Sequence, residues 1–290
     1  MNHPDYNSPA EIKKFLEENG MSMQKKFGQN FLINADARNR IAGFLEPQEN
    51  DIIWEVGPGL GCMSEIFLLN KAHLTVFEID KGFSKFLKEF FCNFSEDGTF
   101  SLVQGDVLKT WENEYNKLSA EKRNAIKLFG NLPYNIAATF IAQTITKGIF
   151  FTRCLFTVQK EVALRMCAKP SSKDYSSFSV LCQLPYDVKL CPELGPGNFW
   201  PRPNVASQTV LLTKKAELPS YSQKNFVKAV HALFSSRRKT ILNNIKPLLP
   251  AGFDAASFLE SAGLDSKLRA ENLSVYDFAR LSTNLSSAKI

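Results

Sequence analysis

The tetrapeptide Asn131-Leu132-Pro133-Tyr134 combines an amide, a rigid turn and an aromatic ring. An amide oxygen and a backbone carbonyl can accept hydrogen bonds from both N–H groups of an exocyclic amine, and Asn131 with the carbonyl of Leu132 suits that task. Pro133 stiffens the turn, and Tyr134 offers a ring on which a base can stack. We therefore expect these residues to hold adenine by its amine, although the same four residues also suit an ordinary tight turn.

Such a site would act by positioning. The exocyclic nitrogen of adenine is a poor nucleophile because its lone pair is delocalised into the ring. Acceptors that align both N–H bonds favour the geometry in which the lone pair is available. An electrophilic carbon held in line then needs no general acid or base.

A second group of residues could bind a nucleoside cofactor. The apolar run Ile52 to Val56 leads into the turn Gly57-Pro58-Gly59-Leu60-Gly61, and glycines let a ligand approach the backbone closely. Glu78 follows about 20 residues after the glycines, where a carboxylate can accept from ribose hydroxyls. Asp106 follows the next expected strand and can accept from the amine of a cofactor adenine.

Two classes of cofactor contain the ribose that this pattern would bind. A nicotinamide dinucleotide is the less favoured class, because the glycines lack the GxGxxG spacing and no general acid or base accompanies the turn. S-adenosylmethionine carries an adenosine but no phosphate. We therefore expect S-adenosylmethionine as the cofactor.

Alternating strands and helices must position these residues. The expected strands are Ile52 to Val56, Leu74 to Ile79, Phe100 to Gln104, Ile126 to Gly130 and Cys154 to Val158. The helices expected between and after them are Gly61 to Asn70, Phe83 to Phe94, Ala137 to Thr146 and Lys160 to Ala168. This alternation predicts an α/β fold in which a mostly parallel sheet carries helices on both faces.

The flanking regions follow other patterns. Before the sheet we expect a capped helix from Ser8 to Gly20, a loop from Lys25 to Leu32 and a helix from Ala35 to Leu45. After it, Ser179 to Leu190 and Val205 to Thr213 are expected to be strands. Apolar residues past Pro219 keep helical spacing, which predicts a small all-helical C-terminal domain.

Composition bounds the class of protein. The 290 residues are 44% hydrophobic, which suffices for a buried core. No apolar run is long enough for a membrane span, and the N-terminus lacks the layout of a signal peptide, so we expect a cytoplasmic protein without a membrane partner. The six cysteines form no CxxC pair and only three histidines are present. We therefore expect no metal site.

The charge is unevenly distributed. Residues 201–290 hold 13 Lys and Arg against 6 Asp and Glu, whereas residues 1–200 hold 22 against 23. An excess of positive charge confined to the C-terminal third suggests a polyanionic partner. A solvated helical surface would give the same count.

Taken together, the motifs resemble the ribosomal RNA adenine dimethyltransferase family. The resemblance extends from about Lys25 to Arg280. Its motifs are Phe27 to Leu32, Glu55 to Gly61, Glu78, Asp106, Gly130 to Ile136, Gln159 to Val162, Tyr175 to Gln183 and Phe199 to Ser207. It implies a Rossmann-like class I S-adenosylmethionine-dependent methyltransferase fold.

The resemblance also implies a set of site residues. Those expected to bind the cofactor are Asn30, Leu32, Gly57, Gly59, Glu78, Asp106 and Asn131. Those expected at the reacting base are Asn131, Leu132, Pro133, Tyr134 and Phe199, with Phe199 opposite Tyr134 across the base. Those expected to contact RNA are Lys25, Lys26, Arg202, Arg237, Arg238 and Lys239.

Three segments are expected. Residues 1–22 form an N-terminal extension to which the sequence assigns no role, residues 23–219 the catalytic domain, and residues 220–290 the helical RNA-binding domain. Leu233 to Thr240 and Asn243-Asn244 resemble the small-subunit branch of the family. That branch implies dimethylation of two adjacent adenosines in the 3′-terminal hairpin loop of 16S rRNA, in the small subunit or its precursor, by a monomeric enzyme that takes part in subunit biogenesis.

Two alternatives share the catalytic half of this pattern. One is a 23S rRNA adenine methylase of the macrolide-resistance type. The other is a non-catalytic ribosome-assembly factor that keeps the fold without turnover.

Overall fold

The computed structural model describes residues 3–24, 29–132 and 134–288, without the side chains of residues 134 and 135. These residues form two compact units that interleave along the chain. The first unit extends to Phe140 and also contains Phe151–Ala163 and Lys189–Thr213. The second contains Ile141–Phe150, Leu164–Val188 and the chain from Lys214 onward. The expected segments 1–22, 23–219 and 220–290 stay a prediction.

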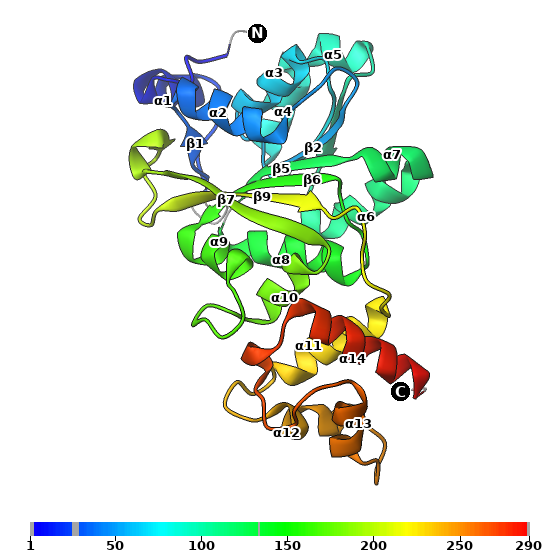
Figure 1. Ribbon diagram of the computed structural model, residues 1–290. Helices are drawn as coiled ribbons and strands as arrows, with labels where there is room; N and C mark the ends of the chain where they lie inside the picture. Colours follow the sequence, from blue (N-terminus) through cyan, green and yellow to red (C-terminus); the bar gives the residue numbers. More distant parts are fainter. Residues whose placement is uncertain (1–2, 25–28, 133, 289–290) are drawn as a thin grey trace. The chain divides into compact units, whose positions relative to one another are not determined.

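The chain forms a seven-stranded sheet in the order β4-β3-β2-β5-β6-β9-β7. Figure 1 labels β2, β5, β6, β7 and β9 of this sheet. Its strands are β2 (Ile52–Val56), β3 (His73–Glu78), β4 (Phe100–Gln104), β5 (Lys127–Asn131), β6 (Arg153–Gln159), β7 (Tyr186–Leu194) and β9 (Ser207–Lys214). The first five strands of this order pair in parallel, and β9 pairs antiparallel with β6. The predicted Rossmann-like, mostly parallel sheet is confirmed.

The central strands are apolar because helices cover both faces of the sheet. Helices α2, α3 and α4 lie on one face, and α6 lies on the other (Figure 1). The helices of this region are α1 (Pro9–Glu18), α2 (Ala35–Leu45), α3 (Cys62–Leu69), α4 (Lys81–Phe90), α5 (Cys92–Glu96), α6 (Val107–Lys117), α7 (Ala120–Ala125), α8 (Tyr134–Thr146) and α9 (Lys160–Cys167). The helices α6 and α7 were not expected from the sequence.

Two expectations about secondary structure were wrong. The strand expected from Ser179 to Leu190 begins as helix α10 (Ser177–Gln183), and β7 starts only at Tyr186. The four consecutive residues Ser179 to Cys182 of α10 are buried, so the sequence shows no helical period there. The loop expected to reach Leu32 ends instead in the short strand β1 (Phe31–Leu32), which pairs antiparallel with β8 (Phe199–Trp200).

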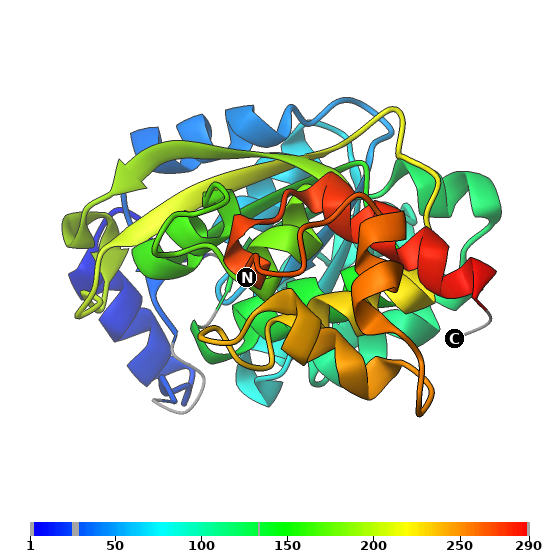
Figure 2. The ribbon, with the colours of Figure 1, turned by 60° about the horizontal axis from the view of Figure 1, so that its bottom comes forward.

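From Gln223 onward the described chain is helical, as predicted. Its helices are α11 (Gln223–Leu233), α12 (Ile241–Ile245), α13 (Ala255–Ser261) and α14 (Val275–Ser287) (Figure 2). Phe226, Val230 and Leu233 of α11 are buried. Within the second unit, the hydroxyl of Tyr175 donates to the carbonyl of Leu273 at 2.9 Å. This bond connects the loop before α10 to the residues just before α14.

Candidate active site

A cavity of about 320 Å³ lies at the carboxyl ends of β2, β3, β4 and β5. This is the edge at which α/β sheets bind ligands, and the volume falls in the range of small-molecule sites. All seven expected cofactor residues line it, namely Asn30, Leu32, Gly57, Gly59, Glu78, Asp106 and Asn131. Leu132 and Phe199, two of the residues expected at the base, line it as well.

The glycine-rich turn forms one wall of the cavity. Gly57 and Gly59 have φ of 69° and 58°, a region that residues with a side chain rarely adopt. A Cβ at Gly59 would lie 2.9 Å from Cε1 of Phe31, whereas a Cβ at Gly57 would meet no atom closer than the Asn131 carbonyl at 3.9 Å. Gly59 is therefore needed for packing as well as for conformation, and Gly57 for conformation and an open wall.

Glu78 ends β3 beside this turn. One carboxylate oxygen accepts from the backbone N–H of Gly59 at 3.2 Å, and the other accepts from that of Asp80 at 2.8 Å. Burial raises the pKa of Glu78 to about 7, although the two N–H donors act in the opposite direction. The carboxylate is thereby fixed at the cavity wall, where it can receive further donors.

Two other polar residues are held in place by the backbone. Asp106 caps α6, with Oδ1 accepting from the N–H of Leu108 at 3.0 Å. The amide Nδ2 of Asn131 donates to the carbonyl oxygen of Asn30 at 2.9 Å. This bond joins the end of β5 to the segment before β1 and defines the orientation of the Asn131 amide.

Glu55 also lines the cavity, although the sequence analysis gave it only as the first residue of a motif and assigned it no role. It is 1% exposed, and its Oε2 accepts from the hydroxyl of Ser64 at 2.5 Å. Burial raises the pKa of Glu55 to about 8, and the nearby Glu78 acts in the same direction. A signal was present, because Glu55 is an acid inside the otherwise apolar run Ile52 to Val56.

The other missed residues are mostly apolar and give the cavity its shape. Those not singled out as cofactor or base residues include Phe31, Val56, Met63, Phe77, Ile79, Val107, Phe129 and Ile136. Their only signal in the sequence was a position within or close to a motif.

Several predicted residues lie elsewhere or outside the described part. Lys25, Lys26 and Pro133 lie outside the described residues, as does the side chain of Tyr134, whose backbone begins α8. Arg202 is exposed on the first unit and does not line the cavity.

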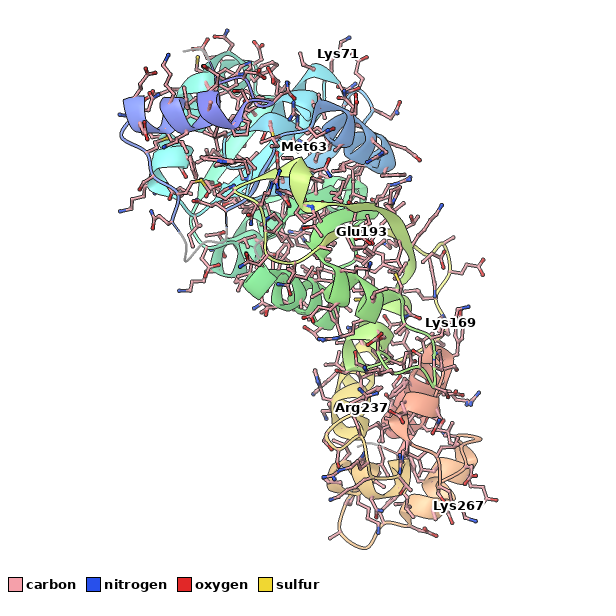
Figure 3. All side chains as sticks on the ribbon, turned by 90° about the vertical axis from the view of Figure 1, so that its left-hand side faces the viewer. Met63, Lys71, Lys169, Glu193, Arg237 and Lys267 are labelled. Atoms are coloured by element: carbon pink, nitrogen blue, oxygen red, sulfur yellow. The ribbon has the colours of Figure 1, made fainter. Side chains whose placement is uncertain are left out.

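The expected RNA-binding residues of the second unit lie between α11 and α12. Arg237, Arg238 and Lys239 are all exposed. Arg237, labelled in Figure 3, pairs with the carboxylate of Glu271 at 2.9 Å and also donates to the carbonyl of Lys173. A structural interaction therefore occupies Arg237, and its role toward RNA stays a prediction.

In residues 3–24, 29–132 and 134–288, no three His, Cys, Asp or Glu side chains gather closely enough to hold a metal ion. Within the same ranges no helix is both long and apolar enough to cross a bilayer.

The residues of the cavity fit S-adenosylmethionine. Glu55, Glu78 and Asp106 line it, whereas none of the described lining residues is Lys, Arg or His. A pyrophosphate would meet no cationic side chain among these described residues, and the positively charged sulfonium group would meet no like charge from them. Glu78 and Asp106 can accept from the hydroxyls and amine of an adenosine, and the apolar side chains can cover its rings.

Comparison with known proteins agrees with this geometry. A family model described as "Ribosomal RNA adenine dimethylase" matches residues 20–287. The "Ribosomal RNA small subunit methyltransferase A" of Treponema denticola is 47% identical over 283 residues, which cover 96% of this chain and 95% of the relative. The protein of the same name from Borreliella burgdorferi is 40% identical over 284 residues, with 98% and 96% covered.

Solved structures share the fold. A dimethyladenosine transferase from Plasmodium falciparum superposes with a TM-score of 0.73 at 22% identity, covering 89% of this chain and 98% of that one. The 23S rRNA methyltransferase ErmE superposes with a TM-score of 0.63 at 20% identity, covering 88% and 99%.

Proposed function

The chain belongs to the ribosomal RNA adenine dimethylase family, and we propose that it dimethylates two adjacent adenosines in the 3′-terminal hairpin loop of small-subunit rRNA. It is an S-adenosylmethionine-dependent rRNA adenine dimethyltransferase. The relatives from Treponema denticola and Borreliella burgdorferi, named for the small subunit, support the choice of 16S rRNA. The substrate particle would be the small subunit or its precursor, which places the enzyme in subunit biogenesis.

One observation carries the catalytic part of the proposal. The cavity that contains Glu78 and Asp106 also contains Asn131, Leu132 and Phe199 on its wall. Residues suited to a nucleoside cofactor and residues suited to a target base therefore share one cavity. Transfer by proximity requires that arrangement.

Three residues of the cavity receive a role toward the cofactor in this proposal. S-adenosylmethionine supplies the methyl group on its sulfonium sulfur. Glu78 accepts from the ribose hydroxyls and Asp106 from the cofactor adenine amine, while Gly57 leaves room for close approach. The cavity excludes water around these contacts because most of its lining is apolar.

The target base is held on the other side by the tetrapeptide. The Asn131 amide nitrogen donates to Asn30, so an acceptor role falls to its amide oxygen, together with the carbonyl of Leu132. These two acceptors would each accept a hydrogen bond from one N–H group of the target amine. Tyr134 would stack on the base, with Phe199 on its other face.

Mapping of dimethyladenosine in rRNA tests the proposal. Cells lacking this protein should contain unmethylated small-subunit rRNA, and the purified protein with S-adenosylmethionine should methylate small subunits from those cells. Modification of large-subunit rRNA instead would favour the macrolide-resistance alternative. Subunits that assemble faster without gaining methyl groups would favour the non-catalytic assembly factor.

A further inference from the structure

We propose that the N-terminal segment, residues 3–24, shapes the S-adenosylmethionine site, with Tyr6 and Arg38 as positioning residues through which it acts. The inference rests on the proposed use of this cofactor. Residues 3–19 precede the part of the chain that the family model matches. In the structure they pack into the first unit beside the glycine-rich turn, so they are in a position to affect that turn.

Tyr6 makes the most direct connection. Its hydroxyl donates to the carbonyl oxygen of Leu60 at 2.9 Å, and the residue is 7% exposed. Leu60 lies between Gly59 and Gly61, both of which have positive φ. Burial raises the pKa of the Tyr6 phenol, so the hydroxyl stays a donor at any working pH. One carbonyl in the middle of the cofactor turn is thus fixed by a residue far outside the motif.

Arg38 connects the same segment to the part of the cavity wall that β1 forms. This α2 residue is 7% exposed, and its guanidinium donates to the carbonyl of Leu32 at 2.8 Å and to Oδ1 of Asn7 at 3.0 Å. The guanidinium also lies 5.7 Å from the centre of the Tyr6 ring. Because Leu32 lines the cavity, Arg38 and Tyr6 together span from the β1 wall to the glycine-rich wall.

A third connection reaches Glu78. The side-chain amide of Gln24 donates to Oδ2 of Asp80 at 2.9 Å. The backbone N–H of Asp80 in turn donates to Glu78 at 2.8 Å. Gln24 therefore holds the residue whose backbone N–H donates to the carboxylate that we assign to the ribose.

Helix α1 anchors these connections. Its residues Ile12 and Leu16 are buried in the main hydrophobic core, and the ring of Phe15 packs edge-on against Phe86 of α4 at 5.1 Å. Neither Tyr6 nor Arg38 lines the cavity. Their effect on the cofactor must therefore pass through the backbone of Leu60 and Leu32, whose carbonyl groups they hold in position.

Tyr6→Phe tests the proposal with little change to packing. Calorimetric titration with S-adenosylmethionine should show binding weakened about 5- to 10-fold, because the turn loses the hydrogen bond that fixes its carbonyl. Affinity for rRNA should stay within about twofold of wild type. Tyr175→Phe is a matched control, since that hydroxyl also donates to a leucine carbonyl at 2.9 Å, but in the second unit.

The control separates positioning from stability. Tyr175→Phe should lower the melting temperature and leave cofactor affinity unchanged. If Tyr6→Phe behaves in the same way, its bond is only structural and the proposal is wrong. That result would leave the proposed function intact. Asn7→Ala gives a second variant, in which loss of the Arg38 acceptor should weaken cofactor binding about 2- to 3-fold. If wild type itself binds no S-adenosylmethionine, the proposed function is wrong as well.

Discussion

The Asn131 amide donates to the carbonyl oxygen of Asn30 at 2.9 Å, across 101 positions of the sequence. The bond makes one residue of the target-base motif depend on the segment that precedes β1. Asn131→Ala should therefore lower turnover and weaken cofactor binding together, since the amine loses an acceptor and the cavity wall loses a tie. Asn131→Asp cannot donate to Asn30. It should weaken cofactor binding in calorimetry as Asn131→Ala does, but should lose less methyl transfer to undermethylated subunits, because Asp keeps an acceptor for the amine. Wild-type behaviour of both variants would remove the residue from the site.

Cofactor binding should depend on pH through Glu78. Its pKa is raised to about 7 by burial, and ribose hydroxyls donate to the ionised form. Affinity for S-adenosylmethionine should thus fall as pH drops through about 7, by up to about tenfold per pH unit. Glu78→Gln should bind more weakly at pH 8 and lose this dependence. Calorimetry from pH 5.5 to 8.5 measures it, and an equal slope in both proteins would contradict the assignment.

Glu55 should make the fold less stable at high pH. Its pKa is raised to about 8 from an ordinary value of 4.5, so the folded chain keeps a proton that the unfolded chain loses above about pH 4.5. The stability due to this proton is complete below pH 4.5 and is lost as pH rises to about 8.

Glu55→Gln isolates that effect because glutamine stays neutral and can still accept from Ser64. Its melting temperature relative to wild type, measured without cofactor, should rise between pH 5 and pH 8.5. Ser64→Ala serves as a control that removes the hydrogen bond while keeping the carboxyl group. A difference between Glu55→Gln and wild type that does not change with pH would show that Glu55 is not the titrating group.

Tyr134 should contribute its ring more than its hydroxyl. Tyr134→Phe should keep most of the activity, whereas Tyr134→Ala should lose about 1 to 3 kcal/mol of base stacking. That loss is roughly a 5- to 150-fold fall in rate at limiting RNA. Methyl incorporation measured alongside melting temperature decides the matter. Wild-type turnover per folded molecule in Tyr134→Ala would mean that the base is held elsewhere.

The basic residues between α11 and α12 should differ in their roles. Replacing Arg238 and Lys239 by Glu should weaken binding to small subunits and flatten its salt dependence, since each phosphate contact contributes about one unit to the log-log slope. Arg237→Gln should lower the melting temperature, which the change at Arg238 and Lys239 should not, because Arg237 pairs with Glu271. Cofactor affinity should not change in either variant. An unaltered salt slope would identify the cluster as a solvated helix end.

The strands and the motifs that follow them were predictable from the sequence because each depends on residues that are close together in the chain. The strands β2 and β4 have the predicted bounds, and the cofactor residues follow strand ends, which parallel strands bring to one edge. The strand expected from Ser179 was wrong because four consecutive residues of α10 are buried and their pattern shows no helical period. Contacts between distant segments, such as Tyr6 with Leu60, leave no pattern in the sequence at all. Glu55 was visible as an acid in an apolar strand, but its burial beside Ser64 depends on the fold.

The pairing of β1 with β8 links two surfaces that the sequence keeps about 170 positions apart. Leu32 of β1 is in register with Phe199 of β8, and both line the cavity. A displacement of either strand therefore moves the wall assigned to the cofactor and the wall assigned to the base together. Binding at one wall that orders the β1–β8 pair would therefore raise the affinity at the other wall. By thermodynamic linkage, the cofactor and the target base would raise each other's affinity by the same factor. The order in which the two substrates arrive would leave that energetic coupling unchanged.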